Sequence, residues 1–150
     1  MTDTRYELKS PDLPADWRTY HEIRRVVLFE DRGIFGVYRD DHPDERAKGN
    51  HPFLLTFNKE PIGTLRIDCQ PDGAAILRLV AIATKYQGRG HGHELLSRAE
   101  HFARARGAKR ILVNAAVEAV GFYSRAGYRQ QTWSDPYGSP SDSIQLAKDL

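Results

Sequence analysis

Residues 77–96, LRLVAIATKYQGRGHGHELL, change from an apolar run to a glycine cluster and then to a helical pattern. The run from Ala74 to Ala83 is apolar almost throughout and predicts a central strand buried on both faces. A strand that enters at Thr84 and a helix that leaves after Gly92 aim unpaired backbone N–H groups at one point, where the helix dipole adds partial positive charge. Glycine also lets an anion approach the backbone closely. The stretch therefore predicts a phosphate or pyrophosphate site.

The glycine spacing separates this site from two familiar nucleotide motifs. Gly88, Gly90 and Gly92 give G-x-G-x-G after a run of antiparallel strands. A dinucleotide fold has G-x-G-x-x-G after the first strand of a parallel unit, and a P-loop has Gly-Lys-Ser/Thr. A flexible turn without a ligand is the alternative, but three glycines at a helix start after a buried strand favour the anion.

Strand and helix patterns alternate on both sides of this junction. The turn signals EPIG and QPDG separate three apolar runs, which predicts adjacent antiparallel strands. Gly107 and Gly127 are natural helix ends. The chain is expected to form one domain over residues 1–150, a mixed α/β fold with a mostly antiparallel sheet of about seven strands and helices on both faces. The expected strands are 5–10, three within 52–84, 109–114, 128–133 and 143–150, and the expected helices are 10–31, 93–106 and 115–126.

Composition excludes several classes of protein. Hydrophobic residues make up 40% and charged residues 28% of the 150 positions, which is ordinary for a soluble globular domain. The single cysteine, Cys69, rules out an internal disulfide and fits a reducing cytoplasm. No signal peptide or membrane-spanning run is visible. The net charge of +2 is too mild to indicate nucleic acid. We therefore expect a cytoplasmic protein with no membrane or nucleic-acid partner.

Two motifs resemble one family. Q-G-R-G-H-G at 87–92 matches the Q/R-x-x-G-x-G/A signature of the GCN5-related N-acetyltransferases (GNAT), and the preceding residues are similar to that family's V-A-V-x-P-x-Y stretch. The segment 113–129, VNAAVEAVGFYSRAGYR, is similar to its N…A…FY…GF segment. The resemblance spans about residues 53–150, with Thr84 in place of the family's proline. The order and separation of the two motifs make it specific.

The resemblance implies acetyl-CoA as co-substrate and no metal. Family members move the acetyl group to an amine by direct attack. By position, backbone N–H groups of the glycine loop would bind the pyrophosphate, and the strand before it would bind the pantetheine arm and polarise the thioester carbonyl, where a fixed donor can contribute roughly 3 kcal/mol. Asn114 would contact the arm, or alternatively cap the next helix. The implied cofactor-binding residues are Val80, Ala81, Ile82, Gln87, Gly88, Arg89, Gly90, His91, Gly92, His93 and Asn114.

Tyr123 matches the family tyrosine that protonates the leaving thiolate. A phenol has a pKa near 10 and a thiol near 8.5, so the phenol can donate at neutral pH. The alternative is a core aromatic, because Tyr123 shares helical spacing with Ala119 and Ala126. Gly121 favours the catalytic interpretation, since glycine inside a helix suggests the close approach of another group.

The sequence does not choose a general base. An alkyl ammonium must lose a proton before attack. The central strand carries Arg78 and no carboxylate. Asp68 and Glu30 are the carboxylates to test, and a water relay is equally compatible with the sequence.

The acceptor is expected to be a small-molecule amine rather than a protein. Asp40, Asp41 and Asp44 lie in a loop where relatives often build the acceptor pocket, so they could meet a cationic amine. His42 and His51 lack metal-ligand spacing, which favours a polar surface loop. A catalytically weak acetyl-CoA sensor or interaction module is the alternative function. Relatives often form a homodimer through the last strands.

Overall fold

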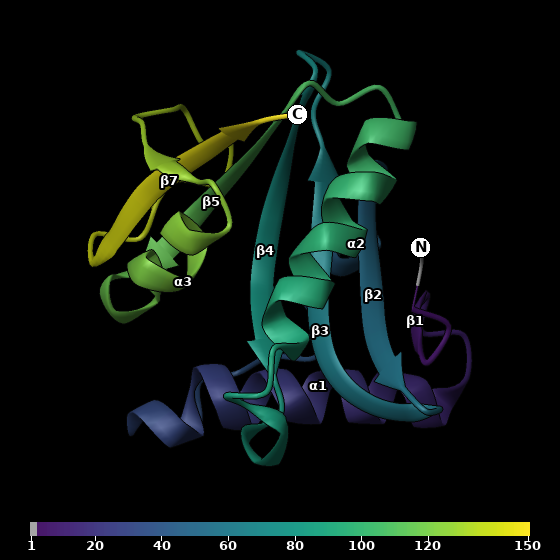
Figure 1. Cartoon of the computed structure of the whole chain (residues 1–150). Helices are drawn as coiled ribbons and strands as arrows, with labels where there is room; N and C mark the ends of the chain where they lie inside the picture. Colours follow the sequence, from purple (N-terminus) through teal and green to yellow (C-terminus); the bar gives the residue numbers. More distant parts are fainter. Residues whose placement is uncertain (1–2) are drawn as a thin grey trace.

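The computed structural model describes residues 3–150, which form one seven-stranded sheet of order β1-β2-β3-β4-β5-β7-β6 (Figure 1). Every neighbouring pair is antiparallel except β4 and β5. The predicted mixed, mostly antiparallel sheet with helices is confirmed. Its strands are β1 (Tyr6–Lys9), β2 (Asn50–Phe57), β3 (Glu60–Cys69), β4 (Ala74–Ile82), β5 (Arg110–Ala116), β6 (Arg129–Gln130) and β7 (Ser143–Asp149). The helices are α1 (Pro14–Leu28), α2 (His91–Ala105) and α3 (Val120–Arg125), with short 3-10 helices η1 (Glu30–Arg32), η2 (Pro43–Arg46), η3 (Thr84–Tyr86) and η4 (Val117–Ala119).

Alternating side chains divide the core into two layers. Leu55 and Leu77 share a buried cluster with Leu95 and Ala99 of α2. Leu54, one residue from Leu55 and therefore on the opposite face, packs with α1 in a separate cluster. Helices α1 and α2 thus cover opposite faces of the sheet, as predicted.

Strands β4 and β5 pair over only four residues. Ala74–Leu77 pairs with Arg110–Val113, and beyond these residues no pairing joins the two strands in the described part of the chain. Figure 1 shows β4 and β5 diverging from their paired end towards α1 and α3. The sheet therefore opens at the carboxyl ends of its two parallel strands.

A bulge interrupts β4 at the start of this opening. The β3–β4 register pairs Thr64 with Ala81 and Arg66 with Arg78, so two residues of β4 face one of β3. Leu79 adopts φ +52°, a left-handed conformation that is strained for a leucine. The extra residue takes the main chain at Leu79 and Val80 out of the regular β3 ladder. Strain of this kind concentrates at functional sites.

Several predicted boundaries are wrong. EPIG lies inside β3, and the turn before it is made by Asn58 and Lys59, both at positive φ. The predicted helix 115–126 begins with the last two residues of β5, and its α-helical part is only Val120–Arg125. The predicted strand 128–133 is reduced to Arg129–Gln130. In each case, sheet pairing or a local turn ends an element that side-chain pattern alone would extend.

Helix α1 buries Tyr20 and Ile23, which are three residues apart on one face, and also buries Arg24. It ends at Leu28, so Glu30 lies in η1 beyond the helix. Among residues 3–150, no helix is long and apolar enough to cross a membrane.

Candidate active site

The glycine loop forms the wall of a cavity of about 460 Å³, here called the loop cavity. Gly88 and Gly90 adopt φ +75° and +87°, and a Cβ atom at either position would meet no atom within 4 Å. Helix α2 begins at His91, directly after Gly90. Backbone conformation, rather than packing, therefore requires these two glycines, and the helix N-terminus faces open space that an anion can occupy.

Most of the predicted cofactor residues come together in this cavity. They are Val80, Ala81, Ile82, Gln87, Gly88, Gly90, His91, Gly92 and His93, whereas Arg89 does not line it. The imidazole of His91 is buried and hydrogen-bonded through Nδ1 to the Tyr6 hydroxyl at 2.6 Å. The His93 ring packs against Phe122 at 4.9 Å between centroids. Tyr6 thus holds the buried His91 side chain, while the His93 ring packs on Phe122 but remains exposed. The backbone N–H groups of both residues lie in the first turn of α2, where an anion is favoured.

The opening between β4 and β5 holds a second cavity of about 440 Å³, the wedge cavity. Asn114 lines it from the middle of β5, so the alternative interpretation of Asn114 as a helix cap is wrong. Its Nδ2 donates to Asp135 at 2.8 Å, but its buried Oδ1 has no hydrogen-bond partner in residues 3–150. A buried acceptor without a partner costs about 1–3 kcal/mol, and an amide N–H of a pantetheine arm would satisfy it. Asn114 therefore fits the cofactor.

Tyr123 lies where these two cavities meet. It lines both of them, together with Val80 and Ala119. Burial raises the pKa of the Tyr123 phenol, so the hydroxyl is protonated at neutral pH. No hydrogen bond from this hydroxyl occurs within the described residues. It is therefore available to donate a proton to a group bound between the cavities.

The two other helical glycines of this region have different surroundings. A Cβ at Gly92 would lie 2.9 Å from the Phe122 ring, whereas one at Gly121 would meet only the flexible Arg125 side chain at 3.4 Å. The close approach that the sequence suggested for Gly121 is therefore at Gly92 instead. The Phe122 ring of α3 is therefore in contact with α2 at Gly92. This contact fixes the relative position of the two helices beside the loop cavity.

Alanine substitutions should distinguish these glycines. We expect Gly92→Ala to lower the free energy of unfolding by about 1–3 kcal/mol through overpacking, and to weaken acetyl-CoA binding because the loop must shift. Gly121→Ala is the matched control and should be neutral or stabilising by up to about 1 kcal/mol. Urea denaturation and calorimetric titration measure both effects. Equal stability of the two variants would contradict the Phe122 contact.

A third cavity of about 310 Å³, the outer cavity, adjoins the wedge cavity. The two share Phe29, Arg78 and Leu79, the last being the strained residue of the bulge. The loop, wedge and outer cavities therefore follow one another along the carboxyl end of β4, with the bulge between the last two. Such an arrangement lets two molecules meet at the bulge from opposite sides.

A buried ion network lies behind the outer cavity. Asp68 is fully buried and accepts hydrogen bonds from Arg66 at 2.7 and 2.8 Å and from Arg78 at 3.1 Å. Arg78 also binds Asp135 in bidentate fashion at 2.6 and 2.8 Å. Burial alone would raise the pKa of Asp135, but the bonds from Arg78 hold it below its usual value. Both carboxylates are therefore paired with arginine guanidinium groups.

The two predicted candidates for the base are therefore not favoured. Asp68 belongs to this ion network, and Glu30 forms an ion pair with Arg25 at 3.2 Å and lines none of the cavities described here. Arg66 lies two residues before Asp68 on the same strand, so the spacing is compatible with this contact, whereas Arg78 comes from β4 and could not be paired with Asp68 from the sequence.

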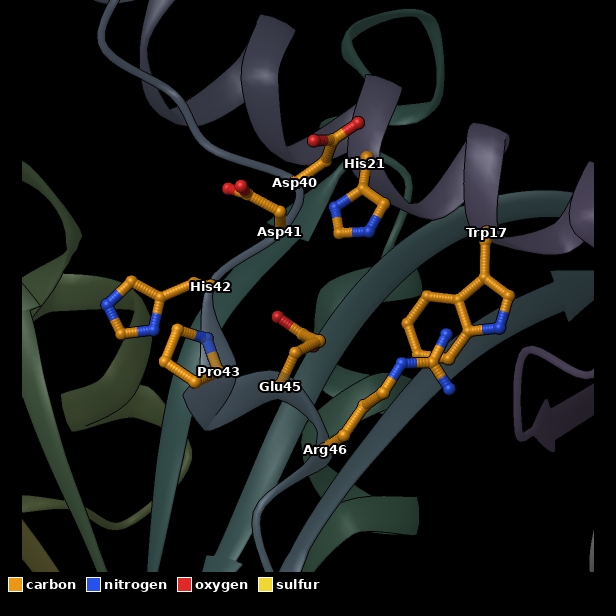
Figure 2. A pocket seen from close by; sticks show the side chains of 8 residues that line it. All are labelled: Trp17, His21, Asp40, Asp41, His42, Pro43, Glu45 and Arg46. Atoms are coloured by element: carbon orange, nitrogen blue, oxygen red, sulfur yellow. The ribbon is translucent and has the colours of Figure 1, made fainter.

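The acidic loop divides between two cavities. Asp44 lines the outer cavity, and Asp40 and Asp41 line a smaller one of about 140 Å³ together with His21 (Figure 2). His42 lines both cavities. Within residues 3–150, no group of three or more His, Cys, Asp or Glu side chains could hold a metal ion.

The sequence did not predict a site role for Glu45, Arg24, Tyr38 or His21. Glu45 accepts hydrogen bonds from Tyr20 and, at 2.6 Å, from Arg24, and all three are buried. Tyr38 lines the outer cavity and is hydrogen-bonded to His21. One feature of the sequence could have pointed to two of them. Arg24 and His21 lie next to the apolar positions of α1, and therefore near the face of the helix that packs on the sheet.

Comparison with known proteins agrees with this geometry. Residues 31–137 match the family model described as an acetyltransferase (GNAT) domain. The chain is 27% identical in sequence to a protein from Lactobacillus plantarum whose crystal structure is assigned as that of an N-acetyltransferase. The two structures superpose with a TM-score of 0.76 over 97% of this chain and 98% of that one. An acetyltransferase from Streptococcus agalactiae superposes with a TM-score of 0.81 at 20% identity, over 99% and 100% of the two chains. The uncharacterized N-acetyltransferase YjcF of Bacillus subtilis is 23% identical over 85% of this chain and 88% of its own.

The fold and the cavities at the carboxyl end of β4 fit the class of acyl-CoA-dependent acyltransferases. With the family match over residues 31–137, the chain belongs to the GNAT family and is an acetyl-CoA-dependent N-acetyltransferase.

Proposed function

We propose that this enzyme acetylates the primary amine of a small molecule, with Tyr123 as the general acid. The observation that carries the proposal is the continuity of the three cavities, with Tyr123 and the β4 bulge at their two junctions. An outer cavity of about 310 Å³ matches the lower end of the range for small-ligand sites. A small amine therefore suits it better than a folded protein.

The donor would bind through the loop and wedge cavities. Backbone N–H groups from Gln87 to His93 would hold the pyrophosphate, and Val80 to Ile82 would bind the pantetheine arm through main-chain hydrogen bonds. Asn114 Oδ1, which has no hydrogen-bond partner among the described residues, would accept from an amide of the arm. The thioester would then reach the bulge at Leu79 and Val80. An N–H there would stabilise the oxyanion that develops on the carbonyl oxygen.

The chemical step forms a C–N bond and breaks a C–S bond. The amine enters from the outer cavity and attacks the thioester carbonyl across the bulge. As the tetrahedral intermediate collapses, the thiolate takes the proton of the Tyr123 hydroxyl. Overall, an ammonium ion and acetyl-CoA give an amide, free CoA and one proton released to water.

The fold itself leaves the acceptor open. The same architecture occurs in a ribosomal-protein-S18-alanine N-acetyltransferase from Escherichia coli and in a spermidine N-acetyltransferase chimera. The acceptor therefore has to be identified by experiment.

An amine panel tests the proposal. Thiol release from acetyl-CoA is measured with propylamine, putrescine, spermidine, amino-acid amides and a short peptide with a free N-terminus. We expect at least one small amine to accelerate CoA release at least tenfold over the hydrolysis rate, and to do so better than the peptide. Tight acetyl-CoA binding without any amine-dependent release would instead support the sensor alternative.

A further inference from the structure

Transfer of the acetyl group to an amine that arrives as an ammonium ion requires a proton acceptor on the side of the outer cavity. Asp68 and Asp135 are held by arginines, and Glu45, which lines the same cavity, is bound by Tyr20 and Arg24. Burial alone would raise the pKa of Glu45, but Arg24 and Tyr20 keep it below its usual value. A carboxylate in this state is a weak base. Asp44 and His42 also line the cavity and contact each other, whereas the Tyr38 hydroxyl is hydrogen-bonded to a titratable side chain outside it.

Tyr38 and His21 join the outer cavity to the small cavity beside it. Tyr38 lines the outer cavity together with Leu79, and its hydroxyl lies 2.5 Å from Nδ1 of His21. His21 projects from α1 into the small cavity, close to the loop that carries Asp40 and Asp41 and opposite Glu45 (Figure 2). His21 is itself partly exposed to solvent. One hydrogen bond therefore connects the amine side of the site to water.

Aromatic packing fixes both rings. The His21 ring stacks on Trp17 at 22° with centroids 5.8 Å apart. The Tyr38 ring packs against Phe29 at 5.4 Å, and Phe29 also lines the outer and wedge cavities. Held in this way, the pair needs no large rearrangement to pass a proton, which is the requirement for efficient general-base catalysis.

The surrounding charges suit this role. Burial lowers the pKa of His21, and Arg24 and Arg46 lower it further, while Glu45 and Asp40 oppose them. Asp41 and His42 line the same small cavity. Burial raises the pKa of Tyr38, and Arg24 opposes this effect. At neutral pH the imidazole is thus neutral and the phenol protonated, with Arg24 able to stabilise a transient phenolate.

We propose that Tyr38 and His21 form the proton relay that deprotonates the acceptor amine. The ammonium gives one proton to the Tyr38 oxygen as the Tyr38 hydroxyl proton passes to Nδ1 of His21. The imidazolium then releases that proton to water through the small cavity. After attack, the nitrogen loses its second proton, which restores the hydroxyl of Tyr123 after Tyr123 has protonated the thiolate, so the net release is the one proton passed to water. Tyr38 touches the acceptor, and His21 acts through Tyr38.

This inference rests on the proposed function, and pH profiles test it separately. The profile of kcat/KM is measured with the best amine of the panel, using one with a pKa near 10. For the wild type we expect a plateau between the ionisation of His21, below about 6.5, and that of the amine. For His21→Gln we expect a loss of about 10³-fold at pH 7, the ratio of ammonium to free amine three pH units below the amine pKa. The loss should shrink tenfold per pH unit and nearly disappear at the amine pKa. The reason is that the variant can use only the fraction of the amine that is already deprotonated in solution.

Matched variants separate the relay from structural effects. Tyr38→Phe should give the same sloping profile as His21→Gln, and the double variant should be no slower than either single one. His101→Gln on the exposed surface of α2, and Tyr128→Phe, whose hydroxyl binds Glu100, should both keep the wild-type plateau. The KM for acetyl-CoA should not change in any of them.

Three outcomes would overturn the relay. One is a wild-type plateau in His21→Gln or Tyr38→Phe, and another is additive losses in the double variant. The third comes from NMR titration of the His21 imidazole, which needs no acceptor and uses the wild-type protein: a His21 pKa above 7 would rule the relay out. If no amine of the panel accelerates CoA release, the proposed function fails, whatever the titration shows.

Discussion

Replacing Tyr123 by Phe is expected to lower kcat for acetyl transfer by about 10²–10⁴-fold. Tyr123 is the only residue besides Val80 and Ala119 that lines both the loop and wedge cavities as described, and neither of those two carries an acid. Without the phenol, the thiolate must leave unprotonated or take its proton from water. The ring remains, so the packing with Phe122 and Tyr128 remains as well. Single-turnover measurement of CoA release reports the chemical step directly.

The control for this substitution is Tyr128→Phe. Tyr128 is also a buried tyrosine, but its hydroxyl donates a hydrogen bond to Glu100 at 2.9 Å. Tyr128 lines neither the loop cavity nor the wedge cavity. It should keep its catalytic rate while losing some stability. Acetyl-CoA affinity, measured by calorimetry, should be unchanged in both variants. A Tyr123→Phe enzyme with the wild-type single-turnover rate would show that Tyr123 is a core aromatic only.

The sequence predicted those parts of the fold that depend on local pattern. The apolar run at Ala74–Ala83 became the central strand, and the glycines before His91 became the positive-φ entry to α2. Both signals are contained in a few consecutive residues. The β4 bulge was not predicted, because the left-handed conformation of Leu79 accompanies the register shift against β3 and does not follow from leucine itself.

The polar side of the site depends on long-range contacts, which sequence pattern does not contain. Arg24 and Glu45 are 21 positions apart, and Arg78 and Asp135 are 57 apart. Each residue alone is typical of a solvated surface. His21 and Tyr38 become a pair only when the loop after α1 folds back over that helix. The donor side could therefore be predicted from motifs, whereas the acceptor side required the three-dimensional structure.

The Asp68→Ala variant should be the most destabilised of the substitutions considered. Asp68 is fully buried and compensates two guanidinium groups, those of Arg66 and Arg78. Breaking a buried ion pair by removing one partner costs about 3–5 kcal/mol, because the remaining charge stays buried. For a chain of this size, that corresponds to a fall in Tm of roughly 10 °C. Urea denaturation and thermal melts measure both values. Asp149→Ala, which removes an exposed partner of Arg129, is the control and should change the Tm little.

A paired substitution separates charge compensation from loss of volume. In Arg66→Leu/Asp68→Leu the two opposite charges leave together, and Arg78 keeps its bidentate bond to Asp135. Replacing a buried ion pair by apolar residues of similar size often leaves the stability of the protein unchanged or raises it. The double variant should therefore be more stable than Asp68→Ala although it changes more atoms. If the double variant is instead less stable than Asp68→Ala, the network stabilises the fold through packing or hydrogen-bond geometry rather than through charge. The Asp68 side chain would then be required for its shape and hydrogen bonds.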